Sequence, residues 1–431
     1  MKYLLLTLFC SLHIYTHAGG NGWLIDIATT TRISAQHYSE MVCDNMGYVY
    51  IASYVKDTLK NVDDIYIVKV SPEGEKIWEK GIGNHGRAIS ISIDSKQRLW
   101  VTGYFANRLT LDEQYIKCKE VAGFIATIDT SGICTQLSAM PDGTDMHNIH
   151  INNNDDILIT GTYANSLKLG KQKIETNRQT SGFVAIYNND GDAVFLGDIQ
   201  AYVTDVTSDT NGSFYLTGSF AELFLFQGSE LYTQSYLDKD GFLLKLSNEG
   251  ELLWLNQTGK VGEVSEFYTS HDMGCDLAID DEQRIILPVI EDSTYEDKAL
   301  IVNIYDNDDG DLLKSKKLCN ILGASGGVSI EVVKGKYYLS LLAKDRCWFD
   351  GKFQMYVDDY EVIVAELDKN LNITNVISGE SDESYMIRES TSYKNTIYFS
   401  GHYKSKAHID QYRLTGNGKY ALFLYKLNIA K

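Results

Sequence analysis

The stretch Asn152–Tyr163, NNNDDILITGTY, starts with polar turn residues, continues with alternating aliphatic residues and ends in Thr-Gly-x-Tyr. The same phrase returns in six other places: DNMGYVYIASY at 44–54, DSKQRLWVTGYF at 94–105, DTNGSFYLTGSF at 209–220, DDEQRIILPV at 280–289, VKGKYYLSLL near 333 and YKNTIYFSGHY near 393. Strand-forming repeats spaced by about 50 to 60 residues are typical of a β-propeller or a stacked array. We therefore predict an all-β, seven-bladed β-propeller of four-stranded antiparallel blades.

Each repeat is expected to hold four strands. In the third copy the alternation of apolar and polar residues predicts strands at 148–153, 157–163, 182–188 and 193–199. Glycine-centred turns such as NEGE at 248–251 join the third strand to the fourth, because hairpin turns need residues that tolerate positive φ. The glycine after the second strand indicates close packing or a bulge there, at Gly103, Gly161, Gly218 and Gly401.

The longer segment between second and third strands carries a short apolar pair, as at Leu167 and Leu169. That pair predicts that the segment folds back onto its own blade. Copies five and six depart most from the pattern, since Pro288 replaces the Thr-Gly pair in one and the other lacks the leading Asp. We expect those two blades to be irregular or specialised.

The seventh repeat ends after its third strand, so its fourth strand must come from elsewhere. The segment GGNGWLID at 19–26 resembles the fourth strands around Trp78 and Trp254, because in all three a Trp falls four residues after a Gly. We infer that residues 22–28 complete the last blade and close the ring. Closure would pair an otherwise open sheet edge.

The first 18 residues, MKYLLLTLFCSLHIYTHA, are typical of a secretory signal, with Lys2, a short apolar run and a small residue at Ala18. Residues 19–431 are then one propeller domain, exported to the periplasm or the cell exterior. The net charge of −19 argues against nucleic acid as a partner, because an acidic surface repels phosphate. No stretch after the signal is apolar enough to cross a membrane.

The repeat resembles the bacterial seven-bladed β-propeller (SBBP) repeat family over nearly the whole mature chain. The resemblance rests on GYFANRLTLDEQYIKCKEVAGFIATIDTSG at 103–132, GTYANSLKLGKQKIETNRQTSGFVAIYNNDG at 161–191 and DGFLLKL at 240–246. It implies the fold and a bacterial source. Because the motifs are structural, it implies no catalytic residues.

Propellers bind ligands at the mouth of the central channel, where the loops that lead into each innermost strand gather. On or beside these loops lie the candidate ligand-binding residues His37, His85, Arg87, His147, Tyr202, His271, Tyr385 and Arg388. Imidazoles on separate loops can bind a metal or transfer protons. Polar side chains also line any hydrated channel mouth, so the same residues are compatible with no function at all.

No motif of a known catalytic or metal site is present, and no catalytic residue, cofactor or metal is predicted. The acidic segment DNDDGD at 306–311 lacks the first ligand of a calcium loop, because Tyr305 occupies that position, and it is expected to be a hairpin turn. The sequence therefore predicts a non-enzymatic, monomeric binding or scaffolding propeller for a protein or glycan ligand. The alternative is a polysaccharide lyase or hydrolase with a histidine-lined site at the channel mouth.

Overall fold

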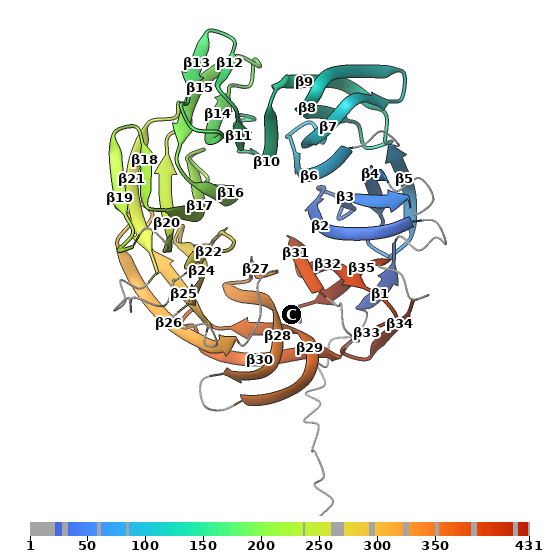
Figure 1. Cartoon of the computed structure of the whole chain (residues 1–431). Helices are drawn as coiled ribbons and strands as arrows, with labels where there is room; N and C mark the ends of the chain where they lie inside the picture. Colours follow the sequence, from blue (N-terminus) through green and yellow to red (C-terminus); the bar gives the residue numbers. More distant parts are fainter. Residues whose placement is uncertain are drawn as a thin grey trace, which may run out of the picture.

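In the computed structural model, seven antiparallel sheets surround a central channel, and each sheet presents its first strand to that channel (Figure 1). The structure describes residues 22–27, 33–57, 62–82, 86–235, 238–259, 271–292, 298–321, 327–349, 353–380, 386–416 and 421–429. The proposed signal at 1–18 lies outside these residues. The predicted seven-bladed propeller is confirmed.

The blades are numbered here along the chain. Blade 1 contains β2 (Ile33–Cys43), β3 (Val49–Asp57), β4 (Val62–Val70) and β5 (Lys76–Ile82). Blade 2 contains β6 (Gly86–Ile93), β7 (Leu99–Leu111), β8 (Gln114–Ile128) and β9 (Cys134–Asp142). Blade 3 contains β10 (Thr144–Ile151), β11 (Ile157–Tyr163), β14 (Ser181–Tyr187) and β15 (Ala193–Ile199). Blade 4 contains β16 (Tyr202–Ser208), β17 (Phe214–Ala221), β20 (Lys239–Leu246) and β21 (Leu252–Thr258).

The remaining blades follow the same order, with two exceptions. Blade 5 has a broken first strand, and it contains β22 (Met273–Gly274), β23 (Ala278–Ile279), β24 (Ile285–Asp292), β25 (Lys298–Tyr305) and β26 (Leu312–Ile321). Blade 6 contains β27 (Ser329–Val333), β28 (Lys336–Phe349), β29 (Phe353–Leu367) and β30 (Ile373–Glu380). Blade 7 takes its fourth strand from the start of the described chain, and it contains β31 (Met386–Tyr393), β32 (Thr396–Tyr403), β35 (Ala421–Asn428) and β1 (Trp23–Asp26).

The predicted closure is confirmed. β1 pairs antiparallel with β35, with Trp23 opposite Lys426 and Ile25 opposite Leu424. Leu24 joins the buried cluster of blades 6 and 7, which includes Phe423 and Tyr425. Because β1 covers the outer edge of β35, blade 7 has four strands like its neighbours (Figure 1).

A repeated contact at the outer wall explains why the three Trp residues share one spacing. In each case the indole Nε1 donates to a turn carbonyl of the next blade at 3.1 Å, from Trp23 to Pro72, from Trp78 to Thr130 and from Trp254 to Asn307. A third-strand lysine donates to the same carbonyl at each interface, and these lysines are Lys426, Lys69 and Lys245. We call each such set the Trp–Lys clamp, and the clamp made by Trp23 shows that β1 behaves as a true fourth strand.

Glycine is required in the turns that receive these clamps. Gly74, Gly132 and Gly310 have positive φ of 91°, 90° and 78°, as the turn chemistry predicts. A Cβ on each would approach the ring of the clamping Trp to 3.1 Å or less. Both backbone conformation and the close approach of the indole therefore exclude a larger residue.

In blades 3, 4 and 7 the segment between second and third strands forms an outer hairpin, and its apolar pair is buried. Separate hairpins are β12 (Ser166–Leu169) with β13 (Gln172–Glu175), β18 (Leu223–Phe226) with β19 (Ser229–Tyr232), and β33 (Lys406–Ile409) with β34 (Tyr412–Thr415). Phe224 packs on Phe242 of its own blade, with ring centroids 5.0 Å apart, as predicted. Phe226 also reaches Phe195 on the fourth strand of the preceding blade, at 6.1 Å, so the hairpin joins two blades.

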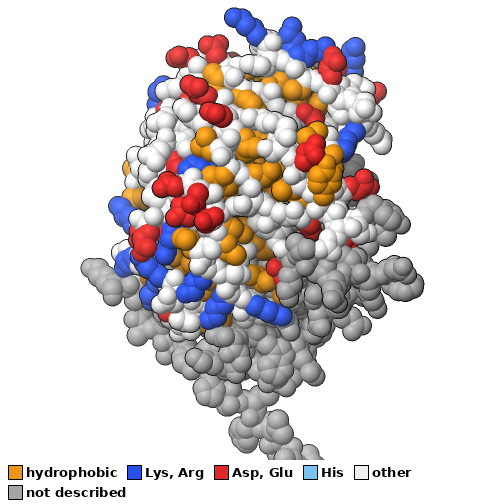
Figure 2. All heavy atoms as spheres, turned by 90° about the vertical axis from the view of Figure 1, so that its left-hand side faces the viewer, with side chains coloured by type: hydrophobic (Ala, Val, Ile, Leu, Met, Phe, Trp, Pro, Cys, Tyr) orange, Lys and Arg blue, Asp and Glu red, His pale blue; other side chains and the backbone are white. Residues whose placement is uncertain are grey.

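The outer wall is mixed in character (Figure 2). Along the side of blades 3 to 5, hydrophobic side chains gather among charged ones. The exposed aliphatic residues include Val194, Leu253, Leu312 and Leu313, which lie on fourth strands. The described part of the chain contains no helix that is long and apolar enough to cross a membrane.

Candidate functional site

The channel lining is built by a bulge in the first strand of several blades. The register shifts between Ala88 and Ser90 in blade 2, and equivalent shifts occur in blades 3, 4 and 7. The opposite residue is a glycine within the second strand, and a Cβ on Gly103 of β7 would lie 1.9 Å from the Arg87 carbonyl oxygen. That glycine therefore makes room for the bulge, as the sequence indicated, and the extra residue, such as Ile89 or His147, turns towards the channel.

Each first strand carries what we call its axial residue, which in blades 2, 3, 4 and 7 comes directly after the bulge. This residue pairs with the Ala, Ser or Thr that precedes the second-strand glycine or its equivalent, and in blades 1, 2, 3, 4, 6 and 7 it is Glu40, Ser90, Asn148, Asp205, Ser329 and Glu389. In blade 5 the corresponding residue is Asp276, between β22 and β23. The break follows from Pro288, which has no N–H to offer the first strand, and blade 5 is thus irregular as expected.

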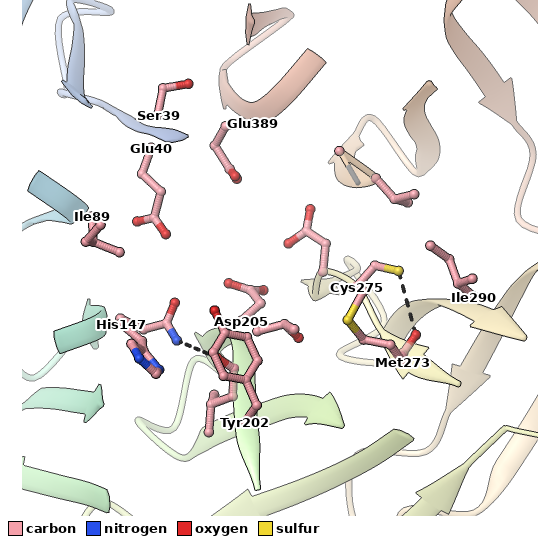
Figure 3. Close-up of a pocket in the computed structure, with 16 residues that line it drawn as sticks. Ser39, Glu40, Ile89, His147, Tyr202, Asp205, Met273, Cys275, Ile290 and Glu389 are labelled. Atoms are coloured by element: carbon pink, nitrogen blue, oxygen red, sulfur yellow. Dashed lines mark hydrogen bonds between the residues drawn. The ribbon is translucent and has the colours of Figure 1, made fainter. Parts of the chain in front are cut away.

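A cavity of about 190 Å³ lies between these strands. Glu40, Asp205, Asp276 and Glu389 line it together with Asn148, and Figure 3 shows Glu40 and Glu389 directed into one space from different strands. The side chains of His147 and Tyr202 line the same cavity. No lysine or arginine lines it among the described residues.

Most axial residues bond to the first strand of the next blade. Glu40, Ser90, Asp205 and Asp276 accept hydrogen bonds from backbone N–H groups of Ile91, Ile149, Leu277 and Ile330, at 3.3, 3.0, 2.8 and 2.7 Å. Asn148 instead donates to the Val203 carbonyl at 3.2 Å. We call these contacts axial straps. They give Glu40, Asp205 and Asp276 a structural role whatever else these carboxyl groups do.

The axial carboxyl groups hold their protons more tightly than free carboxyl groups. Burial raises the pKa of Glu40 to about 8 and raises the pKa of Asp205. Burial, followed by the neighbouring acids, also raises the pKa values of Asp276 and Glu389. These side chains keep a little accessible surface because they border the cavity, yet protein surrounds that cavity on most sides.

Two further carboxyl contacts complete the ring. Asp205 and Asp276 are hydrogen-bonded to each other through their carboxyl groups, so one of the two must carry a proton. Glu331 lies two residues after the axial Ser329, and burial raises its pKa to about 7. The charges of Asp205 and Glu331 both act on Glu389, which makes the five acids one electrostatic group.

At the mouth of the channel, His147 and Tyr202 form an aromatic pair. Their ring centroids lie 4.9 Å apart, and Tyr202 is 51% exposed (Figure 3). Burial lowers the pKa of His147 to about 4, so its imidazole is neutral at pH 7. The pair thus offers one exposed aromatic ring and one neutral ring nitrogen donor or acceptor beside an acidic cavity.

The other candidate residues from the sequence do not join this pair. Arg87 lies over the ring of Tyr54, 4.4 Å from its centroid, and does not line the cavity. His271 is exposed and forms a bridge with Lys239 at the third strand of blade 4. His85 and Tyr385 lie outside the described residues, and so do the side chains of His37 on β2 and Arg388 on β31.

The sequence analysis missed the axial acids, although a signal was present. Glu40, Asp205 and Asp276 each stand four residues before the Asp that opens the first turn of their repeat. That Asp is structural: Asp209, for example, accepts from the backbone N–H groups of Asn211 and Ser213 and from the Tyr215 hydroxyl, each at 2.9 Å. An acid at a fixed distance from it could have marked the channel.

In the described part of the chain, no group of three or more His, Cys, Asp or Glu side chains is placed to hold a metal ion. The segment 306–311 is the turn between β25 and β26, with Asp306 accepting from the Asp308 N–H at 2.8 Å, as predicted for a hairpin turn.

The sequence matches no protein-family model and no curated protein. Solved structures with a similar fold include virginiamycin B lyase from Staphylococcus aureus, with TM-score 0.50 and 9% identity, covering 94% of this chain and 98% of that one. The β-propeller domain of the Trilobed protease from Pyrococcus furiosus has TM-score 0.46 and 10% identity, with coverages of 94% and 97%. At 9% identity the likeness to the lyase shows the propeller fold alone.

Proposed function

We propose that this protein is a non-enzymatic binding propeller whose ligand contacts the channel mouth. The observation that carries the proposal is the aromatic pair of His147 and Tyr202 at the edge of the channel cavity. An exposed tyrosine ring beside buried polar groups suits a ligand with an apolar face and hydroxyl or amide groups, such as a sugar ring or a protein loop.

A glycan array probed with residues 19–431 tests this proposal. We expect a bound glycan whose affinity falls about tenfold in Tyr202→Ala, corresponding to about 1.4 kcal/mol. The matched control is Tyr232→Ala, because Tyr232 is 61% exposed but lies on the outer hairpin strand β19. Equal losses of affinity in both variants, or unchanged affinity in Tyr202→Ala, would contradict ligand binding at the channel mouth. If no glycan binds, crosslinking from position 202 tests the protein-ligand form, and an absence of crosslinked partners rejects it.

An enzyme acting on polysaccharide is the second candidate, and one observation favours it. The hydrogen-bonded carboxyl groups of Asp205 and Asp276 retain a proton next to the cavity, as a general acid must. Incubation with polysaccharides, followed by assays for new reducing ends and unsaturated products, tests this activity. Turnover abolished by Asp276→Asn would replace the binding proposal with the enzymatic one.

We also propose that the chain is an exported member of the SBBP repeat family. The support is the repeat phrase, the DGFLLKL match at 240–246 and the signal-like segment at 1–18. Fractionation of the native host, with mass spectrometry of the mature amino terminus, tests the export. A protein that retains residues 1–18 in the cytoplasm would contradict it.

A further inference from the structure

The axial acids have a consequence that does not depend on any ligand. Four of the seven axial residues are carboxylic acids, and a fifth acid, Glu331, lies two residues after the axial Ser329 on β27. The axial acids of blades 4 and 5, Asp205 and Asp276, are hydrogen-bonded to each other. Glu40 and Glu389 belong to blades 1 and 7, which are also neighbours in the ring. Their straps to the next blade make the ring part of three blade interfaces.

We propose that this ring is a pH-responsive latch: protonated, it bridges neighbouring blades across the channel, and ionised, it loosens the blade interfaces at the axis. The physical reason is that five carboxylates in one narrow channel repel one another when charged. A shared proton turns that repulsion into a hydrogen bond, as between Asp205 and Asp276.

The groups that face the ring leave the repulsion uncompensated. Around the ring lie, in chain order, Glu40 of β2, Ile89 of β6, His147 and His150 of β10, Tyr202 and Asp205 of β16, Cys275 and Asp276 between β22 and β23, Glu331 of β27 and Glu389 of β31. Both histidines are neutral at pH 7, because burial lowers their pKa values to about 4. Among these described side chains there is no cation to balance the acids.

The sign of the pH dependence follows from linkage. A carboxyl group in the unfolded chain ionises near pH 4, whereas the folded pKa values of Glu331 and Glu40 are about 7 and about 8. The folded protein therefore holds more protons in this window, and stability falls as pH rises from about 5 to about 8. Each such carboxyl raises the unfolding equilibrium constant by up to about tenfold per pH unit.

Denaturant unfolding of the full chain between pH 5 and 9 tests the latch. Glu389→Gln removes one ionisable group at similar volume. We expect its unfolding equilibrium constant at pH 8 to be at least about tenfold smaller than that of the wild type, and its unfolding free energy to change less steeply with pH. The matched control is Asp112→Asn on the outer surface, where Lys80 lowers the pKa of the carboxyl against the effect of burial. Its slope above pH 6 should equal that of wild type. A Glu389→Gln protein with the wild-type slope, or less stable at pH 8, would overturn the proposal.

A second measurement needs no variant. Hydrogen exchange of the Leu277 and Ile330 amides reports the straps made by Asp205 and Asp276. After correction for base catalysis, we expect their protection to fall between pH 6 and 9, while the amide of Leu243 in the buried blade interior stays protected. Constant protection of Leu277 and Ile330 across this range rejects the latch even if Glu389→Gln fails to fold.

Discussion

The outer wall and the axis of this propeller join the same neighbouring blades in different ways. At the wall, one arrangement recurs: the Trp–Lys clamp closes three interfaces with the same residue types and the same 3.1 Å indole bond. At the axis the position is fixed but the residue changes, from Ser90 to Asn148 to Asp205. A clamp needs one shape to reach a turn carbonyl, whereas an axial strap needs only a polar atom. The axis can therefore accumulate charge without losing the fold.

The largest effect should come from removing the closure, which is where the clamp of Trp23 sits. Deleting residues 20–30 removes β1 and leaves the edge of β35 open, so we expect loss of soluble expression or of cooperative unfolding. Thermal unfolding followed by circular dichroism checks this, with the chain 19–431 as control. If the deleted protein melts like the control, the wall does not depend on closure.

A smaller effect should separate the packing of the clamp from its hydrogen bond. Trp254→Ala removes the indole that covers Gly310 and bonds to Asn307, and we expect a loss of about 3 kcal/mol in unfolding free energy. Trp254→Phe retains most of the packing and should cost about 1 kcal/mol. Urea unfolding measures both. Equal losses would mean that packing contributes little at the wall.

An effect smaller than that of Trp254→Ala concerns the axis on its acid side. His150 bonds to Ser208 of the next blade at 2.9 Å, and burial lowers its pKa from about 6.5 to about 4. The neutral imidazole thus contributes stability above pH 6.5 that is lost as pH falls towards 4, up to about 2 kcal/mol at pH 5. His150→Gln should remove this loss, as measured by urea unfolding at pH 7 and 5. If the variant loses as much stability at pH 5 as the wild type does, another group causes the acid sensitivity.

His150 and the axial acids make stability depend on pH in opposite directions. Acidification protonates the buried histidine, and alkali ionises the buried carboxyl groups, so the axis alone should give a stability maximum between the two. At the wall, burial lowers the pKa of the clamp residue Lys69, and the negative charges of Asp44 and Asp129 offset part of that effect.

Much of the architecture could be predicted because its signals are local. Alternating residues define strands, glycines define turns, and the Gly-to-Trp spacing at Trp23, Trp78 and Trp254 identified the missing strand of blade 7. The outer hairpins were foreseen on their own blades, but the reach of Phe226 to Phe195 of the preceding blade was not. A contact between repeats depends on how blades stack, which no single repeat encodes.

The candidate site was predicted only in part. His147 and Tyr202 meet at the channel mouth, whereas Arg87 lies over Tyr54 and His271 is exposed. The long segment 260–270, considered as a rim element, lies outside the described residues. Loop position alone located residues near the axis, but the bulge in β10 decided that His147 enters the channel.

The order of strands, the number of blades and the closing strand were thus set by the sequence itself, because periodicity, turn chemistry and repeat spacing act within a few residues of one another. The axial ring was decided by the tertiary structure. Glu40, Asp205, Asp276 and Glu389 are far apart in the chain, and each is a lone acid in its strand until ring closure brings them to one cavity. Only then do burial and mutual repulsion change their proton affinity, because both depend on distance in space and not on distance along the chain.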